Sequence, residues 1–351
     1  MRLSFILALV VLVLADVVAS SCASRPGARH PGVKVAPPVA AAAPPPLAPL
    51  PPPAVSGALR VGLSDETGTR IVTLSLEDYV LGAVRAELPP STLRDSSLSR
   101  MIEVQAIVSR TFALASSGRH AAEGFDVCDG THCQVYRAAR ATESEGEPVS
   151  LAVAATRGLV ITYEGRLIQA LFHANCGGYT ASAASVWGGR DLPYLRAVPD
   201  WFCSRKTAPA GWTFSADASA VLRALAVITA TDVGEPLLGI EVAERDASGR
   251  AVLVALSGAR TLTVRAEAFR SVMNQAFGER AIRSTRFTIA SQDDRYDFSG
   301  TGSGHGVGLC QAGALERVRA GESVADIIAH YYPGTVIQPM PAGLIAPHPG
   351  S

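Results

Sequence analysis

The chain has 351 residues, moderate hydrophobicity and equal numbers of acidic and basic side chains, 31 of each. This length fits one large globular domain, or two small ones, with appendages. The lack of a basic excess gives no indication of a nucleic-acid partner.

Residues 1–22 have the layout of a secretory signal peptide: one basic residue, an apolar run too short for a comfortable transmembrane helix, and then small residues before Cys22. Small residues directly before a cysteine resemble the bacterial lipoprotein cleavage box, which would make Cys22 a lipidated N-terminus. Ordinary cleavage and secretion is the alternative. In both cases we expect an exported protein, periplasmic or in the cell envelope. If Cys22 is lipidated, the membrane is contacted only through this N-terminal lipid anchor.

A tether is predicted for residues 23–56, which contain the run PPVAAAAPPPLAPLPPPAV. Such a segment cannot bury a core and favours extended polyproline geometry. The tail at 338–351 is also expected to be loose, so the predicted folded unit is residues 57–337.

The first half of this unit shows strand and helix patterns. Strands are predicted at LRVGLS and RIVTLS, and a helix after Ser75, with Asp78 in the position of a capping box. A second helix over about 94–115 is apolar nearly all round and should be buried. A short helix at 150–156 precedes strands at GLVITY and RLIQALFH.

The region 215–275 mixes helical patterns (DASAVLRALAV, AEAFRSVMNQAF) with strand patterns (LGIEVAERD, AVLVALS, TLTVRA). Strand signals at FTIAS and YDFSG follow, then a glycine-rich loop that leads into the helix of CQAGALERVRAG. Ser323 opens a last helix. Because helices and strands do not strictly alternate, we predict an α+β fold of mixed sheets with packed helices.

Glu87 is the unusual residue of the first helix. On a helical wheel it falls in the middle of the apolar arc formed by Leu76, Tyr79, Val80, Ala83 and Val84, whereas Glu77, Asp78 and Arg85 lie outside. It also lies in the last turn, where the helix dipole presents negative charge. Both surroundings should raise the pKa of its carboxyl, as general-acid chemistry requires. The alternative is that the apolar arc has ended by Leu88 and that the side chain of Glu87 is exposed to water.

The stretch FDVCDGTHCQVY gathers Cys128, His132 and Cys133, with His120 upstream. Four nitrogen and sulfur ligands would make a closed structural zinc site. Adjacent His132 and Cys133 would be unusual ligands, however, and the spacing matches no common zinc finger. In an exported protein we therefore favour a disulfide between Cys128 and Cys133 and predict no metal.

Three other cysteines and two histidines lie near glycines or aromatic residues. Cys176 and Cys203 could pair like Cys128 and Cys133, which leaves Cys310 and a modified Cys22. His173 and His305 lie in loops that glycines would let approach a ligand closely. Cys310 as a thiol nucleophile with a histidine base is a further alternative, which the lack of a cysteine-protease signature disfavours.

Several stretches together resemble one family, the SpoIID/LytB domain of stage II sporulation protein D and the amidase enhancer. In chain order they are LEDYVLGAVRAELPPS, VQAIVSRTFAL, GFDVCDGTHCQVY, AVAATRGLVITYEGRLIQALFHANCGGYTASAASVWGG, LPYLRAVPD and GSGHGVGLCQAGALERVRAGESVADIIAHYYPGT. The resemblance spans about residues 57–337 and implies a SpoIID-like domain with an inserted or second lobe.

The resemblance implies peptidoglycan as substrate and cleavage of glycan strands without stem peptides by a lytic transglycosylase. The family's catalytic glutamate matches Glu87. The matching blocks also nominate substrate-binding residues: Gln105, Arg110, His173, Tyr179 and His305. Some members carry a zinc bound near the block of Cys128, but His120 does not fall cleanly at the expected ligand position.

One acid suffices for this reaction. Ordinary glycosidases use two carboxylates, whereas in a lytic transglycosylase the sugar's own C6 hydroxyl attacks the anomeric carbon. The main alternative function is a non-catalytic one, in which the domain binds peptidoglycan and stimulates an N-acetylmuramoyl amidase. A third is a purely structural lipoprotein of the envelope.

Overall fold

The computed structural model describes residues 58–66, 68–138, 147–206 and 211–341. The predicted signal peptide, Cys22 and the tether lie outside these ranges, and so do residues 342–351 of the predicted tail. Within the described ranges no helix has both the length and the apolar character needed to cross a membrane.

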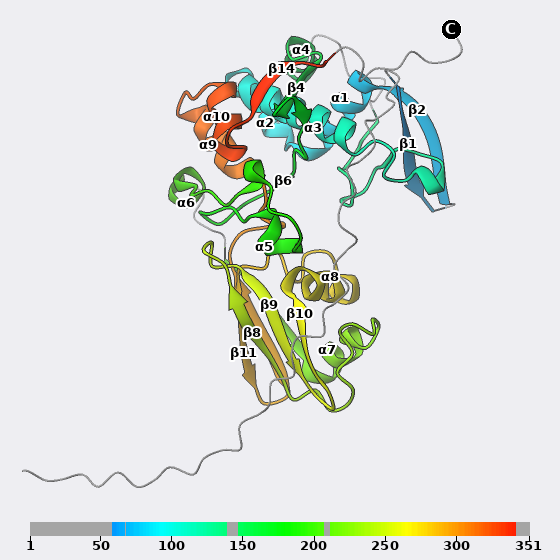
Figure 1. Ribbon diagram of the computed structural model, residues 1–351, viewed down its shortest axis with the longest axis vertical. Helices are drawn as coiled ribbons and strands as arrows, with labels where there is room; N and C mark the ends of the chain where they lie inside the picture. The colour runs from blue at the N-terminus through cyan, green and yellow to red at the C-terminus, as the bar shows by residue number, and fades with distance from the viewer. Residues whose placement is uncertain (1–57, 67, 139–146, 207–210, 342–351) are drawn as a thin grey trace, which may run out of the picture. The chain divides into compact units, whose positions relative to one another are not determined.

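The fold is of the α+β class, as the sequence predicts: helices pack beside several sheets of two or three strands (Figure 1). Buried apolar residues form two clusters. The first draws on residues 59–203 and 307–332, and the second on residues 212–298. The chain therefore leaves the first lobe, forms a second lobe from the inserted segment, and returns.

The first lobe begins with the antiparallel strands β1 (Ala58–Asp65) and β2 (Gly68–Ser75), and β3 (Val127–Cys128) joins β1 in parallel. Helix α1 (Leu76–Glu87) follows at once, because the Ser75 hydroxyl accepts a 3.1 Å hydrogen bond from the Asp78 amide. The predicted strands, helix and cap are confirmed.

The helix predicted over about 94–115 begins only at Ser99, as α3 (Ser99–Ala115). It is preceded by α2 (Pro90–Arg94) and the 3₁₀ turn η1 (Ser96–Leu98). Asp95 separates them, since its side chain caps the turn by accepting a 2.9 Å hydrogen bond from the Ser97 amide. Helix α3 is buried nearly all round, as expected.

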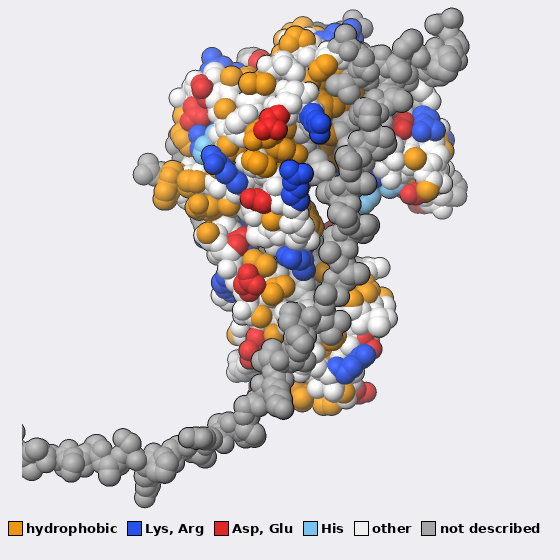
Figure 2. Space-filling view, in the orientation of Figure 1, with side chains coloured by type: hydrophobic (Ala, Val, Ile, Leu, Met, Phe, Trp, Pro, Cys, Tyr) orange, Lys and Arg blue, Asp and Glu red, His pale blue; other side chains and the backbone are white. Residues whose placement is uncertain are grey.

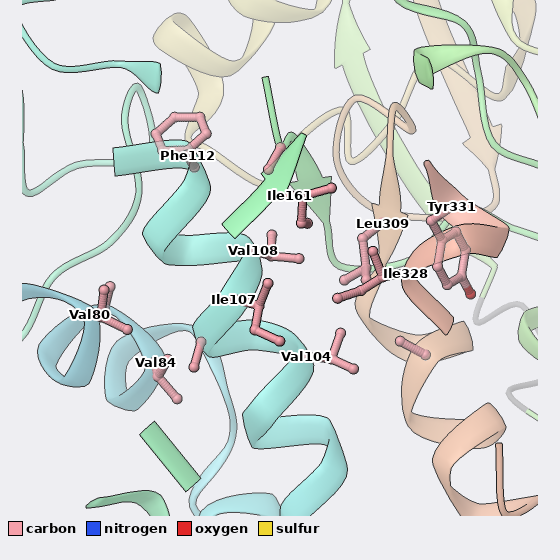
Figure 3. Packing of buried hydrophobic residues seen from close by; sticks show 14 of the residues in the cluster. Val80, Val84, Val104, Ile107, Val108, Phe112, Ile161, Leu309, Ile328 and Tyr331 are labelled. Carbon is pink, nitrogen blue, oxygen red and sulfur yellow. The ribbon is translucent and has the colours of Figure 1, made fainter. Parts of the chain in front are cut away.

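The remaining elements of the first lobe are short. They are η2 (Ala121–Glu123), α4 (Pro148–Ala155), β4 (Leu159–Tyr163), β5 (Arg166–Leu167), β6 (Phe172–His173), α5 (Ala183–Trp187), η3 (Pro193–Leu195), α6 (Trp201–Lys206), β13 (Leu309–Cys310), α9 (Gln311–Arg319), α10 (Val324–Tyr331) and β14 (Val336–Pro339). Figure 3 shows apolar side chains of α3 lying between those of α1 and those of β13 and α10.

Two strand pairings bring the C-terminal part of the first lobe back to its earlier strands. Strand β13 lies parallel to β6, with Cys310 opposite His173. Strand β14 pairs with β4, where Pro339 lies opposite Leu159, and the Met340 amide then donates to the Gly158 carbonyl at 2.8 Å. The folded unit therefore continues beyond Ile337, where its end was predicted, because β14 completes the sheet of β4 and β5.

The inserted lobe contains two antiparallel three-stranded sheets, in the orders β10-β9-β8 and β11-β12-β7. Its elements are β7 (Trp212–Asp217), α7 (Ala218–Leu225), β8 (Gly239–Arg245), β9 (Ala251–Ser257), β10 (Thr261–Arg265), α8 (Ala266–Phe277), β11 (Phe287–Gln292) and β12 (Arg295–Gly300). The helices and strands predicted in this region are confirmed, and β7 was not predicted.

On the face shown in Figure 2, acidic and basic side chains of the described residues are interspersed. This distribution agrees with the balanced charge of the whole chain and shows no extended basic region there.

Candidate functional site

A cavity of about 780 Å³ lies at the end of α1. It is within the size range of small-ligand sites. Its walls come from segments far apart in the sequence, among them Glu87, Val135, His173, Trp187, His305 and Gln311.

Glu87 is the last residue of α1 and is half-buried. The rest of its arc faces the core, as the wheel predicts, and Val80 and Val84 are fully buried. The Val135 amide donates a 2.9 Å hydrogen bond to Glu87 Oε1. Burial raises the pKa of the Glu87 carboxyl above its ordinary value, although the hydrogen bonds from Val135 and Gln311 act in the opposite direction.

The polar side of α1 differs from the wheel at one position. Arg85 is 5% exposed and pairs with Glu147 at 3.1 Å, although the wheel placed it outside the apolar arc. An arginine can be buried in this way when its guanidinium finds a carboxylate and its stem packs on apolar surface.

Gln311 connects Glu87 to the interior. Its side chain hydrogen-bonds Glu87, and its Nε2 donates to Gln105 Oε1 at 3.3 Å. Gln105 is fully buried and continues the network to Ser109 at 3.2 Å. Gln105 therefore lies behind Gln311 and is not among the residues that line the cavity, so substrate binding by Gln105 stays a prediction that this placement does not favour. Gln311 itself was not predicted, although its place just after the glycine-rich loop was a usable signal.

Arg110 is also absent from the residues that line the cavity. It is fully buried, and its guanidinium makes two hydrogen bonds to Glu77, at 2.9 and 2.7 Å, and one to the Leu159 carbonyl at 3.2 Å. These contacts join α3 to the start of α1 and to β4. Its donors are thus engaged in holding the lobe together.

The two predicted histidines do line the cavity. Nδ1 of His173 lies 3.2 Å from the Val307 carbonyl, so that nitrogen carries the proton. Its Nε2 is then an acceptor, and it is buried without a hydrogen-bond partner among the described residues. Burial lowers the pKa of His173 well below its ordinary value, so the ring is neutral.

His305 has a different role. Its Nδ1 accepts a 3.0 Å hydrogen bond from the Val307 amide, and burial together with Arg250 and Arg270 lowers its pKa to about 3. Its ring centroid lies 5.2 Å from that of Trp187, which sequence reasoning missed. His305 and Trp187 therefore present aromatic surface in the cavity, and His305 does not supply a proton at neutral pH.

Tyr179 lies elsewhere. It is half-buried, forms an isolated β-bridge with Pro199 and is not among the residues that line this cavity. Its proximity to His173 in sequence therefore does not bring it into the lining of the cavity.

The structure brings together His120, Cys128, His132 and Cys133, here called the His/Cys cluster. Their ligand atoms all lie within 4.8 Å of one another. His120 reaches it because its Nε2 points to Cys133 Sγ at 3.5 Å while its Nδ1 contacts Glu123 at 2.7 Å. A carboxylate on the second ring nitrogen is the usual support of a metal-binding histidine. The donor set thus fits zinc.

Neither predicted disulfide is formed. Cys128, Cys133, Cys176 and Cys203 each keep a thiol in the structure, as does Cys310. Each predicted pair of cysteines instead belongs to a larger group of potential ligands. Cys128 and Cys133 lie with two histidines, and Cys176 and Cys203 lie with Asp200 and Cys310.

Comparisons with known proteins match the two lobes of the chain to two different families of domains. Residues 64–163 match the family model described as stage II sporulation protein, and residues 212–308 match a domain of unknown function, DUF8618. These two matches fall in the first and the inserted lobe, respectively.

Three similar relatives cover most of the chain. An uncharacterized protein of Brachyspira hyodysenteriae is 31% identical over 265 residues, 75% of this chain and 67% of the relative. Stage II sporulation protein D of Bacillus subtilis is 28% identical over 280 residues, 76% and 75% of the two chains. The amidase enhancer of Bacillus subtilis is 27% identical over 300 residues, 73% of this chain and 40% of that protein. The chain therefore belongs to the SpoIID family.

Proposed function

We propose that this protein is an exported lytic transglycosylase that cleaves the MurNAc–GlcNAc bond of denuded peptidoglycan strands, with Glu87 as its single acid and base. One observation carries the proposal: the carboxyl of Glu87 faces a cavity large enough for sugar units, and burial raises its pKa. The similarity to stage II sporulation protein D supports the same reading.

The hydrogen bond from Val135 assigns the proton of the neutral acid. An amide N–H can only donate, so Glu87 Oε1 must accept it and the acidic proton resides on Oε2. In the reaction, Oε2 protonates the glycosidic oxygen as the bond to the anomeric carbon breaks. The C6 hydroxyl of the muramyl residue then attacks that carbon and gives its proton to Glu87, which restores the acid. No water is consumed.

The other cavity residues suit a sugar. The unpartnered Nε2 of His173 would accept a hydrogen bond from a hydroxyl or acetamido N–H of the glycan. Trp187 and His305 offer aromatic surface to the apolar face of a ring. Arg119 and Arg270 also line the cavity and bring positive charge to it.

We further propose that the His/Cys cluster holds a structural zinc, with His120, Cys128, His132 and Cys133 as a closed set of ligands. Zinc supplies rigidity there and no chemistry. Val135 follows Cys133 by two residues, so a fixed loop would hold the amide that orients Glu87.

The proposed location follows from the N-terminal sequence. Cleavage before Cys22 and lipidation would anchor the chain, and the proline-rich tether would let the domain reach the glycan. An N-acetylmuramoyl amidase, which strips stem peptides, is the partner that would prepare this substrate.

The test is digestion of denuded glycan by the purified protein, followed by mass spectrometry of the products. Anhydro-muramyl ends should form with the wild type and with Glu66→Gln, an exposed glutamate in the β1–β2 turn. They should disappear with Glu87→Gln. If no variant cleaves glycan and Glu87→Gln stimulates an amidase as well as the wild type does, the enhancer function replaces the proposed one.

A further inference from the structure

A second group of potential ligands lies in the first lobe, away from the His/Cys cluster. Cys176, Asp200, Cys203 and Cys310, here called the three-cysteine cluster, have ligand atoms that all lie within 4.8 Å of one another. All four residues are at most 1% exposed. We propose that this cluster binds a divalent metal ion, and that its donor set selects Zn²⁺.

The fold brings these residues together from three segments. The parallel pairing of β6 and β13 sets Cys310 opposite His173, three residues before Cys176. The Asp200 amide donates to the Gly178 carbonyl at 2.9 Å, which draws the start of α6 to the loop that follows Cys176. The convergence is thus fixed by backbone pairing and does not depend on side-chain placement alone.

Backbone amides are directed at two of the three sulfur atoms. Sγ of Cys310 accepts hydrogen bonds from the amides of Cys176 at 3.2 Å and Gly313 at 3.4 Å. Sγ of Cys176 accepts one from the Gly178 amide at 3.3 Å. A neutral thiol is a weak hydrogen-bond acceptor, so three amides directed at two sulfur atoms would suit sulfur atoms that bind a metal ion. Cys310 is in addition the N-cap of α9, where the helix dipole favours negative charge.

Asp200 is held as a metal-binding carboxylate would be. Its Oδ2 accepts a 2.7 Å hydrogen bond from the Tyr331 hydroxyl, and its Oδ1 accepts one from the Cys203 amide at 3.3 Å. Carboxylate ligands are usually oriented by such hydrogen bonds. Two arginines balance part of the negative charge: Arg317 lies 3.9 Å from Asp200, and Arg250 donates to the Cys176 carbonyl at 3.0 Å.

A metal ion accounts for this cluster better than a disulfide. A disulfide would join two sulfur atoms and leave the third thiol beside a buried carboxylate. A tetrahedral ion uses all four groups. With Zn–S bonds of about 2.3 Å, neighbouring ligand atoms lie roughly 3.8 Å apart, a spacing that this group reaches by small side-chain movements.

The bound ion would hold in place two segments that contribute residues to the cavity around Glu87. Cys310 directly precedes Gln311, whose side chain hydrogen-bonds Glu87. Cys176 follows His173 by three residues. The ion would therefore fix both segments, as structural zinc sites do, and take no part in the chemistry.

The test uses the full chain in which Cys128→Ser and Cys133→Ser remove the sulfur ligands of the other cluster. This protein should purify with about one zinc per chain, and X-ray absorption should show three sulfur ligands and one oxygen or nitrogen. Co²⁺ exchanged into it should give thiolate-to-cobalt absorption of a tetrahedral site.

Two further variants complete the test. Cys203→Ser added to this background should lose the zinc, and Asp200→Asn should keep the cobalt bands but release the metal to a chelator faster than its parent does. The proposal is wrong if the folded parent, as judged by circular dichroism, takes up neither Zn²⁺ nor Co²⁺, or if mass spectrometry finds two of its three cluster cysteines in a disulfide.

Discussion

The Val135 amide lies 2.9 Å from Oε1 of Glu87 and donates to it. This contact joins the end of α1 to the loop that carries Cys133, and it occupies one oxygen of the only carboxyl that the wheel placed in the apolar arc. It stabilises the ionised form, yet burial outweighs it and the pKa of Glu87 is raised. The hydrogen bond thus orients the Glu87 carboxyl, and burial favours its protonated form.

The raised pKa of Glu87 predicts a pH-dependent effect on stability. Between the ordinary pKa of about 4.5 and the raised pKa of the folded state, Glu87 is protonated in the folded protein but ionised in the unfolded chain. The free energy of unfolding of the wild type therefore falls as the pH rises through this range. Glu87→Gln should therefore gain stability relative to the wild type between pH 4 and pH 7 in urea unfolding. A difference that does not change with pH for Glu87→Gln would contradict the assigned pKa direction.

Gln311 should affect the pKa of the Glu87 carboxyl. Its hydrogen bond lowers the pKa of Glu87, so Gln311→Ala should raise that pKa further. Because catalysis requires the protonated acid, the alkaline limb of kcat/KM should then move to higher pH. Gln292→Ala, at an exposed position in β11, is the matched control. A lower rate with an unmoved limb would show that Gln311 only maintains structure.

Arg110 should be a stability residue. Arg110→Ala leaves Glu77 without its buried partner, and we expect a loss of about 3 kcal/mol or more in the free energy of unfolding. Arg94→Ala, at an exposed position in α2, should change it by less than about 0.5 kcal/mol. Glycan binding by the folded fraction of Arg110→Ala should equal that of the wild type; selective loss of binding at unchanged stability would restore the role assigned from sequence.

His173 should contribute to glycan binding without titrating. In a Glu87→Gln background, His173→Ala should weaken binding of denuded strands by roughly tenfold, the effect of one lost hydrogen bond. Because the pKa of His173 is well below its ordinary value, this loss should be the same at pH 6 and pH 8. A loss confined to the lower pH would indicate a charged imidazole instead. Isothermal titration calorimetry provides the measurement.

The His/Cys cluster should act on catalysis through Val135. Cys133→Ser should release zinc and lower kcat by about tenfold or more, because the loop no longer fixes the amide at Glu87. Glycan binding should change less than kcat does. Equal zinc content in this variant and the wild type, measured by atomic emission, would exclude Cys133 as a ligand.

Local patterns predicted much of the fold. Ser75 and Asp78 marked the start of α1, and the position of Glu87 in the apolar arc correctly indicated a carboxyl with a raised pKa. The features that the sequence did not show depend on pairing between distant segments. Cys310 lies close to Cys176 because β13 pairs with β6. Arg110 can be buried because its guanidinium hydrogen-bonds the carboxylate of Glu77 on α1. The family resemblance had nominated Arg110 for substrate binding, and Cys310 was left out of the predicted cysteine pairs.

The central claim is that Glu87 protonates the glycosidic oxygen while the sugar's own hydroxyl attacks. The most direct test is digestion of denuded glycan in heavy-oxygen water, followed by mass spectrometry of the released ends. The wild type should yield anhydro-muramyl ends that carry no heavy oxygen, and Glu87→Gln should slow their formation roughly 100-fold or more. Reducing ends that contain heavy oxygen, or anhydro ends formed at an unchanged rate by Glu87→Gln, would contradict it.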